Sequence, residues 1–231
     1  MNKTLSQILT ILCHITCIIS IILSGLFVCI NSSFVTRILS SNTNTYEYTV
    51  YSKEQVADAA VLTRDFSVGD VNYPELANKL NEIGVNANDL DKDMIDHLAE
   101  CTPIFKHISV IEIVCVIASI ILGFLSVKIR GKGTALKSLK LDAIIAMFIF
   151  IALGLLIVLS FDALFTNMHK LFFRDGTWTF AYDSLLICMY PENFWIGMGI
   201  IWCSISALIS IILIIVTNKI KKCHKIENVH N

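Results

Sequence analysis

Four long apolar stretches, separated by polar segments, dominate the hydropathy pattern of the chain. They cover residues 8–29, 108–127, 143–160 and 195–216. About 20 helical residues are needed to cross a hydrocarbon core about 30 Å thick, and each stretch is close to that length. The pattern therefore predicts four transmembrane helices. The first is expected to be retained, because its apolar core is longer than that of a typical secretory signal.

The polar segment 30–107 is too long and too patterned to be a plain connector. Within it, residues 46–51 alternate aromatic and other side chains, which is typical of a short strand. Three helices are expected after that strand, the last running toward Pro103. Their starts are marked by Ser52 with Gln55 in capping-box spacing, by Tyr73-Pro74, and by Asn88 or Asp89.

These elements predict an all-α membrane protein. Four transmembrane helices are joined by a mostly helical extracytoplasmic cap that carries a short β element. The expected divisions are the N-terminus with transmembrane helix 1 (1–29), the cap (30–107), transmembrane helices 2 and 3 with a basic cytoplasmic loop (108–160), an extracytoplasmic interfacial loop (161–194), and transmembrane helix 4 with a cytoplasmic tail (195–231).

Composition and charge agree with the membrane class and set an orientation. The chain is 55% hydrophobic and only 16% charged, which is unusual for a soluble domain of this length. Lysine and arginine gather in residues 128–140 and 219–225, and basic loops stay in the cytoplasm. Both termini are therefore expected in the cytoplasm. Because the basic residues are explained by topology and the net charge is −1, they do not indicate a nucleic-acid partner.

The cysteines indicate neither a disulfide framework nor a metal centre. Of eight cysteines, four lie well inside the apolar stretches and Cys29 lies at the edge of one, and no pair has the spacing of metal ligands on an accessible surface.

Two histidines are candidates for acid–base chemistry at one membrane face. His97 lies on the last expected cap helix, beside Asp96 and Glu100. His169 lies beyond the third apolar stretch, in a segment rich in aromatic residues such as Phe165. Histidine gains and loses a proton near neutral pH, so two histidines on one side can form an acid–base pair.

The local sequence around each histidine favours a different role. His169 is surrounded by apolar residues, and desolvation would keep its imidazole neutral and able to accept a proton. Asp96 and Glu100 are expected to favour the charged form of His97, which would suit a donor to an oxyanion. His14 is instead interpreted as a core histidine bonded to a neighbouring helix. His107 is interpreted as a residue at the membrane interface.

Several motifs resemble those of the lipoprotein intramolecular transacylases of bacteria. They are residues 162–173, Gly176-Thr177-Trp178, residues 189–194, and Asp96 to Cys101. The resemblance implies transfer of the sn-2 acyl chain of a diacylglyceryl-modified lipoprotein to the α-amine of its N-terminal cysteine, giving the lyso form. It also implies a multi-pass protein of the bacterial cell membrane, with its active site on the extracytoplasmic face.

The resemblance further implies which residues form the site. His97 and His169 would be catalytic. The supporting or substrate-binding residues would be Asp162, Phe165, Glu100, Trp178 and Tyr190. Neither a metal nor a cofactor is implied, and the partners would be the lipoprotein substrate and membrane lipid, with the protein monomeric.

Three alternatives remain from the sequence. One is a non-enzymatic tetraspan protein whose outer domain binds a partner, although residues 30–107 contain only one cysteine, Cys101. Another is a metal or haem protein, although only His14 lies inside an apolar stretch. The third is a different membrane acyl or phospholipid enzyme that uses the same histidines.

Overall fold

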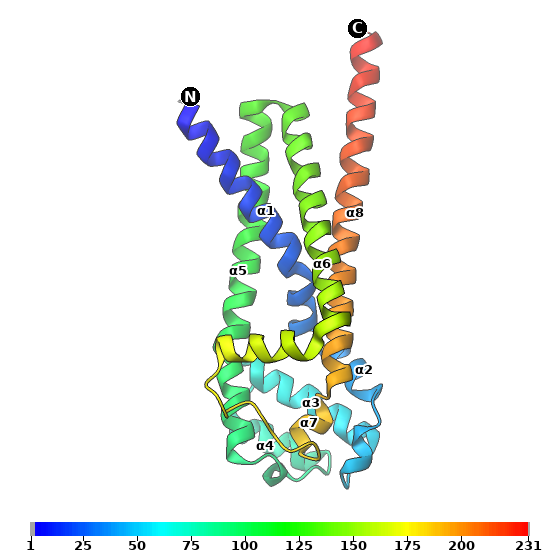
Figure 1. Ribbon diagram of the computed structural model, residues 1–231. Coiled ribbons are helices and arrows are strands. Elements are labelled where there is room, and N and C mark those ends of the chain that lie inside the picture. The colour runs from blue at the N-terminus through cyan, green and yellow to red at the C-terminus, as the bar shows by residue number, and fades with distance from the viewer. Residues whose placement is uncertain (1–2, 231) are drawn as a thin grey trace. The chain divides into compact units, whose positions relative to one another are not determined.

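The structure is a computed structural model that describes residues 3–230, with side chains for residues 4–222. Within these residues all regular secondary structure is helical (Figure 1). The α-helices are α1 Lys3–Asn31, α2 Ser33–Ser41, α3 Lys53–Val68, α4 Tyr73–Glu82, α5 Lys92–Arg130, α6 Lys132–Phe172, α7 Leu185–Met189 and α8 Glu192–His230. Two short 3-10 helices are η1 Thr45–Tyr48 and η2 Ala87–Asp89.

Four helices are long and apolar enough to cross a membrane, as the hydropathy pattern predicts. They are α1, α5, α6 and α8. Helices α5 and α6 have 39 and 41 residues, whereas about 20 suffice for a hydrocarbon core, so their apolar stretches are only part of each helix. The predicted all-α multi-pass membrane protein is confirmed.

The expected β element at residues 46–51 is wrong. Thr45–Tyr48 form the 3-10 helix η1, and the Thr49 hydroxyl donates a hydrogen bond to the Tyr46 carbonyl at 2.8 Å. Aromatic alternation alone does not make a strand, because a strand needs a partner for its backbone N–H and C=O groups. The described part of the chain offers no second strand as that partner.

The last expected cap helix and the second transmembrane helix are one element. Residues Ala87–Asp89 form η2, and α5 then begins at Lys92 and continues through Pro103 to Arg130. Proline has no backbone N–H, so Pro103 removes one hydrogen bond of α5. The helix nevertheless continues into the apolar stretch that follows. The expected start at Asn88 or Asp89 is therefore a few residues early, and Pro103 does not end the helix.

The structure divides into two compact units. The transmembrane unit comprises Met1–Phe27, Ser109–Gly154 and Trp202–Asn231, and the cap unit comprises Val28–Ile108 and Leu155–Ile201. Each long helix therefore contributes residues to both units.

The cap unit has its own hydrophobic core. The predicted capping box is present, with Ser52 and Gln55 exchanging hydrogen bonds at the start of α3. Helix α4 begins at Tyr73, as expected, and Gly84 follows it with φ +77°, a conformation that favours glycine. The buried core residues are Val56, Ala59, Ala60, Leu76, Leu80, Val85, Ala87, Leu90, Met94, Leu98, Leu185, Leu186 and Met189.

The transmembrane unit is held by close helix contacts and paired polar groups. A Cβ on Gly25 of α1 would lie 2.4 Å from the Trp202 carbonyl oxygen of α8, so only glycine fits there. The Trp202 indole N–H donates to the Ile22 carbonyl at 2.7 Å. His14 is hydrogen-bonded to Asp142, which confirms the interpretation of His14 as a core histidine bonded to a neighbouring helix.

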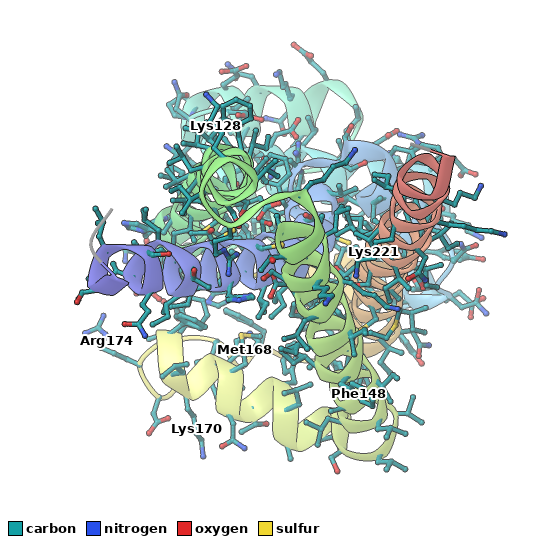
Figure 2. The ribbon with its side chains drawn as sticks, turned by 90° about the horizontal axis from the view of Figure 1, so that it is seen from above. Lys128, Phe148, Met168, Lys170, Arg174 and Lys221 are labelled. Atoms are coloured by element: carbon teal, nitrogen blue, oxygen red, sulfur yellow. The ribbon has the colours of Figure 1, made fainter. Side chains whose placement is uncertain are left out.

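Within the cap unit, α6 bends sharply at Ser160. This residue has φ −152° and ψ 42°, far from helical values. Beyond it, residues 161–172 run across the direction of the preceding turns (Figure 1). The exposed Met168 and Lys170 lie on opposite sides of this segment (Figure 2). We call residues 161–172 the crossing segment.

Candidate active site

Helix α5 places His97 at the edge of the cap core. Met94 and Leu98 are buried, with 7% and 5% of their surface exposed, so the face of α5 that carries them packs against the cap core. His97 lies between them in sequence and is partly buried. Its position precedes the apolar stretch 108–127 of α5.

The crossing segment supplies His169. Its side chain is only 6% exposed, and its Nδ1 lies 2.9 Å from the Phe165 carbonyl oxygen one turn earlier. A carbonyl oxygen can only accept, so Nδ1 carries the hydrogen in this bond. In the neutral imidazole, Nε2 then keeps its lone pair and can accept a proton.

The two histidines lie side by side. Their ring centroids are 6.1 Å apart and the ring planes differ by 23°. The expected approach of His97 and His169 is therefore confirmed, although they come from helices far apart in sequence.

Aromatic rings enclose both imidazoles. Phe173 contacts both, with centroids 4.7 Å from His97 and 5.5 Å from His169. Phe165 and Trp178 lie 4.1 Å and 4.9 Å from the His169 ring. Phe180, 5.6 Å from His97, was not expected, because its loop has no periodic pattern that could have identified it. We call these four residues the aromatic box.

Burial keeps both imidazoles neutral. It lowers the pKa of His97 from 6.5 to about 4, with a further lowering by His169. Burial also lowers the pKa of His169, against a smaller opposing effect of the hydrogen bond to Phe165. Both histidines are thus uncharged near pH 7.

The acids beside His97 in sequence do not raise its pKa. Asp96 instead accepts a hydrogen bond from Lys92 at 2.5 Å on the exposed side of α5. Glu100 faces Arg174 and Thr177. The expectation that Asp96 and Glu100 favour a charged His97 is corrected, because desolvation determines the direction of the shift.

Two buried nitrogen atoms of the site have no hydrogen-bond partner among the described residues. They are Nδ1 of His97 and Nε1 of Trp178. The other ring nitrogen of His97, Nε2, lies 4.0 Å from the Cys101 sulfur. Leaving a buried polar group unpaired is costly, so such groups often mark a place where a ligand binds.

Glu100 connects α5 to the loop that carries part of the aromatic box. The Thr177 hydroxyl donates to its Oε2 at 3.5 Å, and Arg174 Nη2 lies 3.9 Å from its Oε1. The loop turns at Gly176, which has φ +87°. Thr177 and Arg174 were not expected as partners, since only contacts across the fold identify them.

Asp162 and Tyr190 are the remaining predicted residues. Asp162 is exposed in the first turn of the crossing segment, where a carboxylate interacts favourably with the helix N-terminus. No hydrogen bond or ion pair within the described residues holds it. Its predicted supporting role stays a prediction.

Tyr190 is buried and hydrogen-bonded near the site. Its hydroxyl donates to the Ala60 carbonyl at 2.5 Å and lies 2.8 Å from the Thr63 hydroxyl, and burial raises its pKa well above the usual range. The Trp195 indole donates to the Tyr190 carbonyl, and the Trp195 ring lies 5.8 Å from Phe165. Tyr190 is thus joined to the aromatic box through Trp195.

Residues that could bind a metal do not gather in the part of the chain whose side chains are described. No group of three or more His, Cys, Asp and Glu side chains is close enough there.

Comparisons with known proteins give one family. The family model described as lipoprotein intramolecular transacylase Lit matches residues 10–195. The solved structure of the membrane-integral Lit from Bacillus cereus is similar with a TM-score of 0.80 at 16% identity, covering 97% of this chain and 100% of that chain. No curated protein matches the chain significantly.

Two further structures of the Bacillus cereus protein are also similar in fold. They carry one histidine replaced by arginine or by alanine, and both have TM-scores of 0.74 at 15% identity. Coverage is 97% of this chain and 95% of that chain for the arginine variant, and 96% of each for the alanine variant.

Proposed function

The chain belongs to the lipoprotein intramolecular transacylase family, a family of enzymes, and from this premise we propose which bond it makes and which residues act. The substrate is a lipoprotein whose N-terminal cysteine carries a diacylglyceryl group and a free α-amine. The enzyme moves the sn-2 acyl chain to that amine. The observation that carries this proposal is the neutral His97 and His169 pair inside an aromatic box with two unpaired buried nitrogens.

His169 is the base in this proposal. An α-ammonium has a pKa of about 7.7–8.0, so part of the substrate already carries a neutral amine near pH 7. That amine attacks the ester carbonyl, and the nitrogen loses a proton as the C–N bond forms. The Nε2 lone pair of His169 accepts this proton, because Nδ1 is held as a donor by Phe165.

The same proton completes the reaction. As the C–O bond to the sn-2 oxygen breaks, the imidazolium of His169 returns the proton to the glyceryl oxygen. One amide and one free hydroxyl replace one amine and one ester, so atoms and charge balance without a cofactor. Because donor and acceptor belong to one molecule, the enzyme's main task is to hold them in register.

His97 and Trp178 stabilise the oxyanion that develops on the carbonyl. In the tautomer whose Nε2 accepts from the Cys101 thiol, Nδ1 of His97 carries the hydrogen and is free to donate. The Trp178 Nε1–H is the second donor. Neutral donors in a site that excludes water act strongly on developing charge. Asp162, on the exposed part of the crossing segment, attracts the incoming α-ammonium.

The orientation follows from the distribution of basic residues. We place 30–107 and 161–194 outside the cytoplasm of a bacterial cell, with both termini inside, because the basic residues gather at 128–140 and 219–225. The helices of 1–29, 108–160 and 195–231 contact membrane lipid, and the protein acts as a monomer without nucleic acid. Family membership decides against the non-enzymatic tetraspan alternative.

A synthetic lipopeptide tests the bond that is made. It carries palmitoyl at sn-1, oleoyl at sn-2 and a free cysteine amine, and it is mixed with a deuterated copy. Fragmentation of the product should find oleoyl on nitrogen and no exchange between light and heavy molecules. Palmitoyl on nitrogen, or exchanged chains, would contradict an intramolecular transfer from sn-2.

A further inference from the structure

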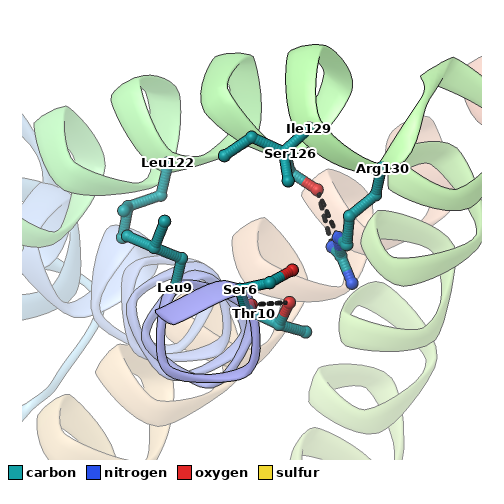
Figure 3. Close-up of a pocket in the computed structure, with 7 residues that line it drawn as sticks. All are labelled: Ser6, Leu9, Thr10, Leu122, Ser126, Ile129 and Arg130. Atoms are coloured by element: carbon teal, nitrogen blue, oxygen red, sulfur yellow. Dashed lines mark hydrogen bonds between the residues drawn. The ribbon is translucent and has the colours of Figure 1, made fainter. Parts of the chain in front are cut away.

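A shallow recess lies between α1 and α5 in the transmembrane unit, separate from the residues of the candidate active site (Figure 3). It is lined by Ser6, Leu9, Thr10, Leu122, Ser126, Ile129 and Arg130. Three of these side chains carry hydroxyls, one is a cation and none is an acid. We propose that this recess binds the phosphate headgroup of an anionic membrane lipid.

Arg130 is arranged as a receptor for an anion. Its Nε and Nη2 donate to the Ser126 hydroxyl oxygen at 3.0 and 2.6 Å, and Nη2 also lies 3.3 Å from the Ser138 hydroxyl oxygen. These bonds hold the guanidinium in place but do not neutralise it. No carboxylate within the described residues lies at ion-pair distance from Arg130, and Asp142, which is bonded to His14, acts on it only at longer range.

Further hydrogen-bond donors line the same recess, although the Thr10 hydroxyl already donates to the Ser6 carbonyl. The third guanidinium nitrogen of Arg130 points away from Ser126, toward the α1 side where Ser6 and Thr10 lie (Figure 3). The Ser126 oxygen accepts from Arg130, so its own hydrogen is free to donate. The Ser6 hydroxyl is partly buried and offers another donor. A guanidinium fork with nearby hydroxyls suits phosphate oxygens.

The surroundings favour a lipid over a soluble anion. Leu9, Leu122 and Ile129 line the same recess, and the neighbouring Ile8 and Ile11 of α1 are exposed, as on a lipid-facing surface. Arg130 lies three residues beyond the end of the apolar stretch 108–127, where headgroups are expected. Basic pockets between helices at this level recognise anionic headgroups.

Lys128 provides a matched control. It is on the same helix and carries the same charge. Its ammonium lies 4.6 Å from the Phe124 ring, and it points away from α1 (Figure 2). Lys128→Gln therefore removes a charge close to Arg130 without changing the recess.

The test measures lipid binding to the full-length protein in detergent by native mass spectrometry. The probes are dilauroyl phosphatidylglycerol, dilauroyl phosphatidylcholine and inorganic phosphate. We expect phosphatidylglycerol to bind at least about 10-fold more weakly to Arg130→Gln than to the wild type, because a charge-assisted contact is lost. Lys128→Gln should stay within about two-fold of the wild type, as an exposed charge contributes little.

Ser6→Leu is the second variant, and it tests lipid binding in the recess on its own if Arg130→Gln does not fold. It fills the recess without removing charge, so it should also weaken phosphatidylglycerol binding at least about 10-fold. Equal loss in Lys128→Gln, or no loss in both recess variants, would overturn the proposal. So would displacement by equimolar inorganic phosphate, which would indicate a soluble-anion site, or equal binding of phosphatidylcholine.

Discussion

The imidazole rings of His97 and His169 lie 6.1 Å apart and nearly parallel, and no hydrogen bond joins them. His169 is tied through Nδ1 to the Phe165 carbonyl, whereas Nδ1 of His97 has no partner among the described residues. Two such groups are placed to act on a third molecule rather than on each other. This difference in hydrogen bonding, more than charge, assigns the two roles that we propose.

Trp178→Phe should lower kcat about 100-fold with little change in KM. The change keeps the ring that covers His169 but removes the Nε1–H, and loss of one oxyanion donor typically costs about 10²–10³-fold. Steady-state kinetics on the synthetic lipopeptide checks this. A raised KM with unchanged kcat would instead assign Trp178 to substrate binding alone.

Glu100→Gln should lower kcat/KM by about 2- to 10-fold. The variant loses its attraction for Arg174, and exposed ion pairs of this kind contribute at most about 1 kcal/mol. The loop that carries Trp178 is then held less firmly. Asp96→Asn is the control, because Asp96 is bonded to Lys92 on the exposed side of the same helix. Equal losses in both variants would mean that bulk charge, not the loop, is responsible.

The pH dependence of kcat/KM should show two acid limbs. The first, at about 7.7–8.0, belongs to the substrate's α-amine, which must be neutral to attack. The second belongs to His169, which must be neutral to accept a proton, and burial lowers its pKa, so this limb lies below 6.5. Phe173→Ala admits water to both histidines and should move this limb upward toward 6.5. A second limb at or above 6.5 in the wild type, or no shift of that limb in the variant, would contradict the desolvated base.

Tyr190→Phe should lower the free energy of unfolding by about 1–3 kcal/mol, because its buried hydroxyl donates to the Ala60 carbonyl and contacts the Thr63 hydroxyl. Thermal unfolding in detergent measures the change. Tyr182→Phe, which alters an exposed tyrosine, should leave stability nearly unchanged. Loss of activity in folded Tyr190→Phe would instead give this residue a direct role in the reaction.

The membrane helices and most helix starts could be predicted, because both depend on residues that are close together in the sequence. Length and hydropathy determine α1, α5, α6 and α8, and the Ser52–Gln55 capping box fixes the start of α3. The strand at 46–51 could not be judged locally, since a strand depends on a partner elsewhere in the chain.

The site was predictable only in part for the same reason. The proximity of His97 and His169 followed from the segments that carry them, but the pKa of His97 depends on burial by Phe173 and Phe180 from a distant loop. Acids adjacent in sequence, such as Asp96, face other partners on a helix. Sequence neighbours are therefore a poor guide to the electrostatics of a folded site.

Mass spectrometry of lipoprotein N-termini tests the central claim most directly. The chain is expressed in a bacterial host whose lipoproteins carry only the diacylglyceryl group. The wild type and His107→Ala should convert them to the N-acylated lyso form, since the His107 side chain is exposed and bonded to the Pro103 carbonyl. His97→Ala and His169→Ala, present at equal levels in the membrane, should reduce conversion about 10²–10⁴-fold. Full conversion by either variant, or loss in His107→Ala alone, would contradict catalysis by the His97 and His169 pair.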